Sequence, residues 1–441
     1  MKKDYSISVI GLGKLGLCAA ACFADKGFKV IGVDIDINKI NKINKGLSPV
    51  AETGLAGLIK KCRNNLKATP DYDLAVLNSS VTFIVVATPS LADGSFSNDY
   101  LEKALHKIGE SLKKKKSYHL IVITSTVMPQ TTETVARFIL ERASAKKAGR
   151  DFGVAYNPEF IALGSVIRDF LNPDFILIGE MNKRDGDILE GIYKKTCENN
   201  PRFARMTPLN AEIAKISLNC YITTKITFAN SLASICDKVK NADASVITRA
   251  LGLDSRIGSK YIRPGLGYGG PCFPRDNVAF AAFARKIEAR AKLAEMVDEV
   301  NRDQALRVVN KIQDILAALH KNKKNAKIGI LGLSYKQNTP IIDDSQALAI
   351  VQLLANEGYS LTVYDPQAME NARGVLGDTV RYAKNSGDCI LGIDLGVIAV
   401  PWDEFRKINL KKLDKNVVLL DCWELLKGVK GINIKYLGVG Y

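Results

Sequence analysis

The stretch ISVIGLGKLGLCAAACFADKGFKVIGVDID, residues 7–36, is the segment from which the fold can be inferred. It predicts an apolar strand, a glycine turn, a helix with small residues on one face, and a second apolar strand that ends at Asp34. Gly11, Gly13 and Gly16 fit GxGxxG in this context: Gly11 permits a tight turn, Gly13 lets a pyrophosphate approach the helix N-terminus, and Gly16 lets helix and strand pack closely. The stretch therefore predicts a dinucleotide-binding βαβ unit; a glycine turn in some other α/β protein is the alternative.

Asp34 indicates which dinucleotide is bound. It follows Gly16 by 18 residues, near the position where a carboxylate takes the adenosine ribose hydroxyls. Because an anion there repels a 2′-phosphate, we expect NAD and not NADP. The expected cofactor-binding residues are Gly11, Gly13, Lys14, Leu15, Gly16, Asp34, Lys39, Thr88, Pro89 and Thr126.

Further βα units follow. Residues 81–90, 119–129 and 174–179 are apolar runs typical of buried strands, and the first two stop at hydroxyl residues and proline. Ligands bind at the carboxyl ends of such strands, so Thr88, Pro89 and Thr126 are expected to border the cofactor. Ordinary turn chemistry is the alternative reading of the same residues.

From about Thr207 the pattern becomes helical for more than thirty residues, and Lys215 and Asn219 share one face of that helix. A second helical region is expected over residues 277–319. A charged linker at 320–327 precedes a new βαβ pattern, which has Gly329 and Gly332 but no GxGxxG, so a mononucleotide is a plausible ligand there. We expect an N-terminal domain over 1–203, a central helical domain over 204–319 and a C-terminal domain over 320–441.

Composition limits the function classes. The 441 residues carry a net charge of +16, but the charge is dispersed, and the one dense run, residues 113–116, is expected to be a solvated loop and not a nucleic-acid patch. The three histidines are expected in polar or helix-edge positions. Nine cysteines without a CxxC pair argue against disulfides or a metal site. No apolar run is long enough for a membrane span and the sequence opens on a strand pattern, so we expect a cytoplasmic protein.

The segment GYGGPCFPRD, residues 267–276, holds the candidate nucleophile, Cys272. Its glycines allow close approach of a ligand, its prolines stiffen the loop, and Arg275 and Lys215 supply positive potential that favours a thiolate. A small buried hydrophobe is the alternative, and it is the expected role of the other eight cysteines. A nicotinamide site with a nucleophilic thiol suggests oxidation of an aldehyde, as a thiohemiacetal, to a thioester that water hydrolyses.

These motifs together resemble the UDP-glucose/GDP-mannose dehydrogenases, over nearly the whole chain, and most closely the UDP-glucose 6-dehydrogenase branch. The resemblance implies two Rossmann-like parallel-sheet domains joined by a central helical region, and oxidation of a nucleotide sugar's primary alcohol to an acid with two NAD⁺. It assigns catalytic roles to Thr126 in STVMP, Glu159 in NPEF, Lys215 and Asn219 in AEIAKISLN, Cys272, and Asp276.

The resemblance also implies a substrate site and an assembly. The substrate-binding residues would be Glu159, Phe160, Lys215, Asn219, Arg256, Tyr261, Gly269, Tyr335 and Lys336. Arg256 would come from a neighbouring subunit, which implies at least a homodimer. Leu163, Arg275, Asp343 and Trp423 depart from the family pattern, so a UDP-N-acetylhexosamine or GDP-mannose is an alternative substrate. A non-catalytic binder of NAD or nucleotide sugar is the alternative from another class.

Overall fold

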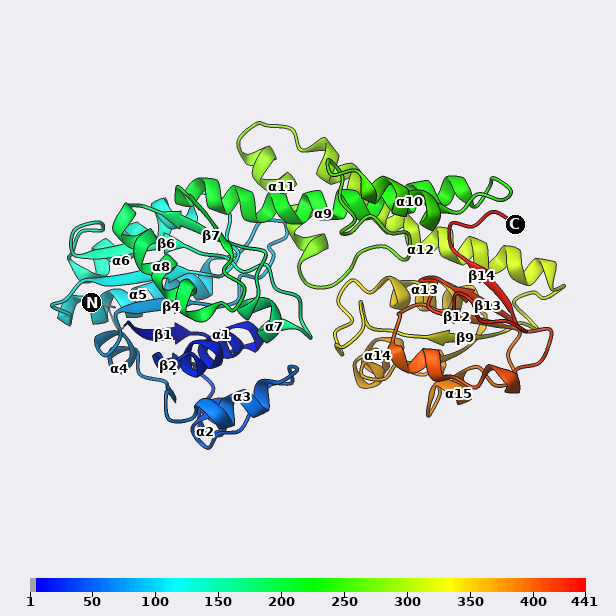
Figure 1. Ribbon diagram of the computed structural model, residues 1–441, viewed down its shortest axis with the longest axis horizontal. Coiled ribbons are helices and arrows are strands. Elements are labelled where there is room, and N and C mark those ends of the chain that lie inside the picture. Colours follow the sequence, from blue (N-terminus) through cyan, green and yellow to red (C-terminus); the bar gives the residue numbers. More distant parts are fainter. Residues whose placement is uncertain (1–4) are drawn as a thin grey trace. The chain divides into compact units, whose positions relative to one another are not determined.

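The computed structural model describes residues 5–441 (Figure 1). The chain forms two compact units whose boundary falls between Ser217 and Leu218, within the long helix α9 (Pro208–Cys236). The three-domain division expected from the sequence stays a prediction.

The first unit is built on an eight-stranded sheet with the order β3-β2-β1-β4-β5-β6-β7-β8. Its strands are β1 (Ser6–Ile10), β2 (Lys29–Val33), β3 (Leu66–Thr69), β4 (Val81–Ile84), β5 (His119–Ile123), β6 (Phe152–Tyr156), β7 (Phe175–Glu180) and β8 (Arg202–Met206). Neighbouring strands are parallel except β6 and β7, which pair antiparallel. The first six strands therefore have the order of a doubly wound dinucleotide-binding fold, and β7 and β8 extend it.

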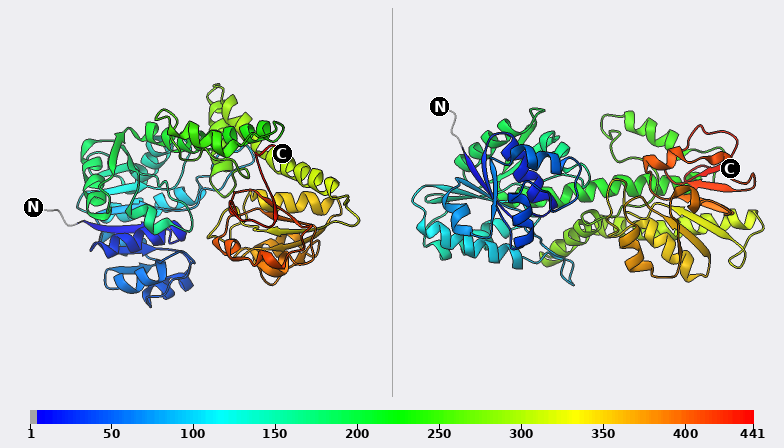
Figure 2. Two further views of the ribbon diagram at one scale, coloured as in Figure 1. Left: turned by 45° about the vertical axis from the view of Figure 1, so that its right-hand side comes forward. Right: turned by 90° about the horizontal axis from the view of Figure 1, so that it is seen from below.

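Helices cover both faces of this sheet (Figures 1 and 2). They are α1 (Lys14–Asp25), α2 (Ile37–Asn44), α3 (Leu55–Cys62), α4 (Tyr72–Leu77), α5 (Asp99–Lys114), α6 (Arg137–Ser144) after a π-helical turn at Thr131–Ala136, α7 (Val166–Leu171) and α8 (Lys183–Thr196). Leu120 and Val122 of β5 join one apolar cluster with α1, α3, α7 and α8, and Ile121 and Ile123 join another with α4, α5 and α6. Successive side chains of a strand point to opposite faces, so an uninterrupted apolar run is what a strand buried on both sides requires.

The second unit contains a six-stranded sheet with the order β11-β10-β9-β12-β13-β14, parallel throughout. Its strands are β9 (Lys327–Leu331), β10 (Ser360–Tyr364), β11 (Arg381–Tyr382), β12 (Leu395–Ile398), β13 (Val418–Asp421) and β14 (Asn433–Tyr436). Its helices are α10 (Ala244–Leu253), α11 (Phe273–Lys286), α12 (Lys292–Ala318), α13 (Gln346–Asn356), α14 (Met369–Leu376) and α15 (Ser386–Cys389), with short 3-10 turns at Asp403–Lys407 and Leu410–Lys412. Apolar residues of α12 and α13 pack into the core of this sheet. The same strand order thus occurs twice in the chain.

Three expectations about the secondary structure and its surroundings were wrong in detail. Residues 113–116 are not a solvated loop, because α5 runs to Lys114 and the buried Lys115 ammonium donates to the carbonyls of Val76, Leu77 and Ser79. The second helical region begins at Phe273 and not at 277. His119 is not in a polar or helix-edge position but is fully buried in β5. No helix within residues 5–441 is both long and apolar enough to cross a membrane.

His119 is accommodated as a neutral ring. Its ring nitrogens lie 2.7 Å from Thr82 Oγ1 and 3.1 Å from the Ser79 carbonyl oxygen. Burial, with a smaller contribution from the Lys115 charge, lowers the pKa of His119 to about 3. The unfolded chain would take up this proton near the ordinary pKa of about 6.5, whereas the folded chain resists it, so stability is lost as the pH falls below that value.

We therefore expect His119→Gln to make the stability of the protein less sensitive to acid. Each pH unit below about 6.5 costs the native protein roughly 1 kcal/mol through this one histidine. The fall in the midpoint of thermal unfolding between pH 7 and pH 5 should be smaller in the variant by about 2–4 °C. The control is His106→Gln, which replaces an exposed histidine of α5 and should leave that fall unchanged. An equal fall in native protein and His119→Gln would contradict the prediction.

Candidate active site

The glycine turn after β1 fits a dinucleotide pyrophosphate. Gly11 has φ +94°, and a Cβ atom there would lie 2.4 Å from the Val85 carbonyl oxygen. A Cβ on Gly16 would lie 1.9 Å from the Gly11 carbonyl oxygen, so α1 can approach the turn only without a side chain at this position. At Gly13, the N-cap of α1, a Cβ would meet nothing within 4 Å, and no side chain caps the helix. Gly11 and Gly16 are packed against the backbone, whereas the space around Gly13 is free for a ligand. The N-terminus of α1 at Gly13 favours an anion there.

Asp34 stands at the end of β2 as a fixed carboxylate. Its Oδ2 accepts from the Leu12 amide at 2.9 Å and its Oδ1 accepts from the Asp36 amide at 3.0 Å. The Lys39 ammonium lies 3.7 Å from Oδ2. Each oxygen keeps acceptor capacity beyond these amides, which suits a ribose diol and disfavours a phosphate.

The second unit repeats this turn in a form that is closed to a dinucleotide. Gly332 corresponds to Gly11, with φ +98°, but Ser334 stands where Gly13 would be and is fully buried. Asp365, at the end of β10 as Asp34 is at the end of β2, is 1% exposed and accepts six hydrogen bonds. The six donors are Leu333 N, Ser334 N, Ser334 Oγ, Gln367 N, Ala368 N and Trp402 Nε1. This carboxylate has no capacity left for a ribose.

The ends of β4 and β5 are tied together beside the glycine turn. Thr88 Oγ1 donates to the Thr126 carbonyl oxygen at 2.7 Å, and Ser125 Oγ donates to the Val86 carbonyl oxygen at 2.6 Å. The two hydroxyl-bearing segments singled out in the sequence therefore lie side by side, with Thr126 partly exposed.

Glu212 of α9 holds the segment that follows Thr126, a role that the sequence reading missed. Its carboxylate accepts from the Gln130 amide at 2.6 Å, from the Thr132 amide at 2.8 Å and from Thr132 Oγ1 at 2.6 Å. Burial raises the pKa of Glu212 to about 7 against the lowering effect of these three donors. The available signal was a carboxylate on a mostly apolar helical stripe.

Glu159, Phe160 and Lys215 form one cluster in the first unit. The Lys215 ammonium donates to the Glu159 carbonyl oxygen at 2.8 Å and lies 4.6 Å from the centroid of the Phe160 ring, which packs on Phe175. Glu159 as a whole is partly exposed, but burial of its carboxyl raises the pKa to about 7, against the lowering effects of the Tyr193 hydroxyl and the Lys215 charge. A carboxyl that titrates near neutral pH suits a general acid or base.

Cys272 is exposed and forms the N-cap of α11. The Asp276 amide donates to its carbonyl oxygen at 2.9 Å, and Asn219 Nδ2 donates to Asp276 Oδ2 at 2.6 Å. Arg275 Nε lies 3.7 Å from Asp276 Oδ1. A helix N-terminus favours a negative charge, so the position of Cys272 at the N-cap of α11 suits a nucleophilic thiol.

The loop before Cys272 is clamped against the loop that follows β9. Gly270, with φ +84°, donates its amide to the Asp343 carbonyl oxygen at 2.8 Å, and a Cβ at this position would lie 2.4 Å from the Tyr335 ring. A Cβ on Gly269 would lie 2.2 Å from the Asp344 carbonyl oxygen. The consecutive glycines are therefore required by close backbone packing, and Asp343 contributes to it through its main chain.

Two other residues that depart from the family pattern, Trp423 and Leu163, make packing contacts within their own units. Trp423 donates its indole N–H to the Ala399 carbonyl oxygen at 2.8 Å, and its ring covers Gly265, where a Cβ would lie 2.7 Å from Cζ3. Arg263 donates to the Trp423 carbonyl oxygen. Leu163 packs against the apolar cluster of α1 and α3.

Two candidate residues lie at the surface of the second unit. The side chain of Arg256 is 87% exposed and pairs with Asp254, two residues earlier, at 2.7 Å. Tyr261, with φ +65°, is half exposed and meets the ring of Phe273 edge-on at 6.4 Å between centroids. The first unit thus groups the cofactor residues with Thr126, Glu159, Phe160 and Lys215, and the candidates from Asn219 to Lys336 belong to the second.

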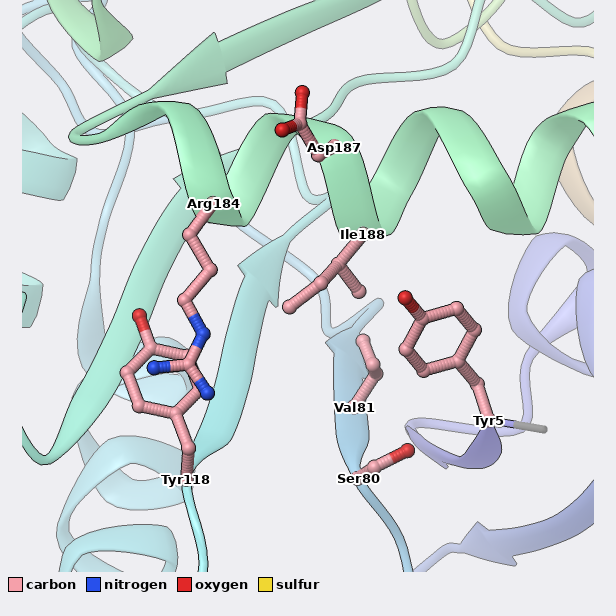
Figure 3. Close-up of a pocket in the computed structure, with 7 residues that line it drawn as sticks. All are labelled: Tyr5, Ser80, Val81, Tyr118, Arg184, Asp187 and Ile188. Carbon is pink, nitrogen blue, oxygen red and sulfur yellow. The ribbon is translucent and has the colours of Figure 1, made fainter. Parts of the chain in front are cut away.

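A cavity of about 310 Å³ in the first unit lies away from these residues (Figure 3). It is found at the amino ends of β4 and β5 and is lined by Tyr5, Ser80, Val81, Tyr118, Arg184, Asp187 and Ile188. The Arg184 guanidinium stacks on the Tyr118 ring at 3.5 Å from the centroid. Because ligands of such sheets bind at the carboxyl ends of the strands, this cavity is not the cofactor site.

Comparison with known proteins agrees with this arrangement. Residues 5–197 match the NAD binding domain of the UDP-glucose/GDP-mannose dehydrogenase family, residues 209–303 its central domain, and residues 329–428 its UDP binding domain. The chain belongs to the UDP-glucose/GDP-mannose dehydrogenase family. It is an NAD-dependent oxidoreductase that acts on a nucleotide sugar.

Several relatives are similar along most of their length. The chain is 36% identical to the UDP-glucose 6-dehydrogenase of Haloferax volcanii over 406 residues, which are 91% of this chain and 93% of the relative. It is 35% identical to the GDP-mannose 6-dehydrogenase of Pseudomonas aeruginosa over 363 residues, 81% of this chain and 80% of that one. The solved UDP-glucose dehydrogenase of Pyrobaculum islandicum superimposes with a TM-score of 0.88 at 32% identity, covering 99% of this chain and 97% of the other.

In this dehydrogenase we expect Asp34→Asn to weaken NAD⁺ binding and to reduce the preference for NAD⁺ over NADP⁺. The amide keeps the size of the side chain but loses the charge that accepts from ribose and repels a 2′-phosphate, so the dissociation constant for NAD⁺ should rise about tenfold. Calorimetric titration with both dinucleotides measures the change. Asp25→Asn, at the far end of α1, makes the same charge change and should bind as the native protein does. Unchanged selectivity in Asp34→Asn would contradict the assignment.

Proposed function

We propose that this dehydrogenase oxidises C6 of UDP-glucose by four electrons to give UDP-glucuronate, through a covalent intermediate on Cys272. The observation that carries the proposal is the exposed Cys272 at the N-terminus of α11, beside the hydrogen-bonded pair of Asn219 and Asp276. A binding protein has no use for an exposed thiol at a helix N-terminus, whereas oxidation of an aldehyde to an acid through a covalent intermediate requires a nucleophile there.

The cofactor fits the residues of the first unit. Gly11, Gly13 and Gly16 shape the turn that takes its pyrophosphate, and Asp34 takes its ribose. Bound NAD⁺ supplies a hydride acceptor for each of the two oxidation steps.

The proposed reaction removes two hydrides from C6 in two oxidation steps. The C6 alcohol loses a hydride and a proton to become an aldehyde, and the Cys272 sulfur adds to its carbonyl carbon to form a thiohemiacetal. Loss of a second hydride and proton leaves a thioester, and water then displaces the Cys272 thiolate to give the carboxylate. Lys215 and Asn219 are assigned to the oxyanion, where preorganised donors are most effective.

Water and proton handling is assigned to three other residues. The pKa of Glu159, near 7, lets it accept or donate a proton at neutral pH. Asp276, oriented by Asn219, lies four residues after Cys272 on α11 and is the second carboxylate for activating water. Thr126 is assigned to hold the water in place.

The decisive measurement is the number of NADH formed for each UDP-glucose consumed. We expect two NADH and UDP-glucuronate from the native protein, and a loss of acid formation of roughly 1000-fold or more in Cys272→Ser, because a hydroxyl is a far weaker nucleophile than a thiolate. Cys62→Ser, at a buried thiol of α3, is the control and should retain activity. Full acid production by Cys272→Ser would rule out the covalent route.

Another nucleotide sugar is the competing substrate. Relatives include the GDP-mannose 6-dehydrogenase named above and a solved UDP-D-ManNAc dehydrogenase from Pyrococcus horikoshii, which is 25% identical with a TM-score of 0.84 over 98% of this chain and 99% of the other. Two NADH from GDP-mannose or a UDP-N-acetylhexosamine and none from UDP-glucose would keep the chemistry and replace the substrate. A cytoplasmic location stays a prediction.

We also propose that the protein is a homodimer formed through its central helices. Tyr221, Phe228 and Ile235 recur every seven residues along α9 and are 63%, 54% and 63% exposed. Helical residues seven apart share a face, so these side chains form one apolar stripe of the kind that marks an interface. The exposed Arg256 follows α10 and is free of the core, as a residue that serves a partner's site would be.

We expect Phe228→Asp to convert the dimer into a monomer, because a charge in the centre of the stripe would be desolvated on association. Light scattering after size-exclusion chromatography gives the mass directly. Tyr100→Asp, at a half-exposed aromatic residue of α5, is the matched control and should not change the mass. A native protein of single-chain mass, or a Phe228→Asp protein that stays dimeric, would contradict the interface.

A further inference from the structure

Three buried or partly buried side chains in the first unit form a chain of hydrogen bonds that ends at Glu159. The Tyr193 hydroxyl of α8 lies 2.6 Å from Asn157 Oδ1 and 2.8 Å from Glu159 Oε1. An amide oxygen only accepts, an ionised carboxylate only accepts, and a hydroxyl carries one proton. With Glu159 ionised, one of the two contacts therefore has no proton.

The orientation of Asn157 is fixed. Its Nδ2 donates to the Leu177 carbonyl oxygen at 2.8 Å, and its main-chain amide donates to the Ile123 carbonyl oxygen at 2.8 Å. Turning the side-chain amide over would place Oδ1 against the Leu177 carbonyl, oxygen to oxygen. Asn157 and Tyr193 are each 1% exposed, so bulk water does not supply the missing proton.

We propose that Tyr193 and Asn157 are positioning residues that set the protonation state of Glu159, because Asn157 and Glu159 compete for the one proton of the Tyr193 hydroxyl. When Glu159 is protonated, its carboxyl donates to the Tyr193 oxygen and Tyr193 donates to Asn157, so both contacts are satisfied. When Glu159 is ionised, the hydroxyl turns to the carboxylate and Asn157 Oδ1 is left without a donor. Asn157 thus favours the protonated carboxyl, and the Tyr193 hydroxyl favours the ionised one.

The inference deepens the proposed function and rests on it for the role of Glu159 in proton transfer. Other groups also face this carboxyl. Lys215 of α9 lowers the pKa of Glu159, and Cys197, which follows α8, has its own pKa raised to about 12 by burial and then by the Glu159 charge. Burial raises the pKa of Glu159 to about 7, so the shared hydroxyl proton acts on a group already balanced near neutral pH.

Two variants test the hydroxyl of Tyr193 and the acceptor of Asn157 separately. Tyr193→Phe keeps the ring that packs on Phe23 and Phe170 and removes the hydroxyl. A hydrogen bond to an ionised carboxylate is stronger than one to a neutral carboxyl, so the Glu159 titration midpoint should rise by about one pH unit. Asn157→Leu removes the competing acceptor and leaves the hydroxyl to Glu159, so the midpoint should fall.

The measurement is the pH titration of the Glu159 carboxyl carbon by NMR in protein labelled with ¹³C at glutamate Cδ, with the resonance assigned by its loss in Glu159→Gln. The pH profile of kcat with UDP-glucose should move in the same direction in each variant. Tyr118→Phe is the matched control: it also removes a hydroxyl that donates to a buried carboxylate of this unit, Asp185 at 2.6 Å, but it lies beside the cavity at the other edge of the sheet. It should leave the Glu159 midpoint in place.

Opposite shifts in Tyr193→Phe and Asn157→Leu support the proposal, since a general loss of stability would not move one midpoint up and the other down. An unmoved or lowered midpoint in Tyr193→Phe overturns it, even if Asn157→Leu does not fold. The NMR titration needs no turnover, so the two proposals can fail separately. Opposite shifts of the Glu159 midpoint in the two variants, with no NADH formed from any nucleotide sugar, would contradict the proposed function alone. Two NADH per nucleotide sugar, with the Glu159 midpoint unchanged in both variants, would contradict the proton competition alone.

Discussion

The cofactor site of the first unit depends on the close approach of α1 to the turn after β1, where a methyl group on Gly16 would lie 1.9 Å from the Gly11 carbonyl oxygen. This contact sets where α1 begins, and so where its N-terminal amides point. The remaining parts of the cofactor site follow from the sheet order, because β4 lies next to β1 and is followed by Thr88, and β2 lies on the other side and is followed by Asp34. A single steric requirement thus fixes the position of an anion site at the point where the strand order reverses.

The two sheets share one topology but differ in whether the turn after the first strand can take a dinucleotide. Both have the strand order 3-2-1-4-5-6 over their first six strands, and both turn after the first strand at a glycine with positive φ. The two turns differ at two side chains. Ser334 occupies the position that Gly13 has in the first unit, and the Asp365 carboxylate accepts hydrogen bonds from six donors of the protein itself. Asp365 stabilises its loops, whereas Asp34 keeps acceptor capacity for a ligand.

The parts of the fold and of the candidate site that depend on local geometry could be predicted from the sequence. The glycine turn, the apolar strands buried on both faces and the long helix α9 each have a period or a spacing that the chain displays directly. β8 was not predicted, because it is an edge strand with polar side chains and lacks an apolar run. The antiparallel direction of β7 has no signal in its own residues, since direction is set by the connection. Glu212, Tyr193 and Asn157 were missed because their partners lie 20 to 82 residues away along the chain, and only tertiary structure brings them together.

The distribution of the nine cysteines has a practical meaning. Seven are buried, Cys197 is partly accessible, and Cys272 alone is exposed and stands at a helix N-terminus. Burial raises the pKa of the thiols in α1 and α3, so they remain protonated and slow to react, whereas Cys272 is open to reagents in solution. A dilute alkylating reagent or an oxidant would meet one sulfur well before the others. The rate at which Cys272 is alkylated should therefore fall when a ligand covers the loop around it, so that this rate reports ligand binding. The same sulfur would be the first to be oxidised.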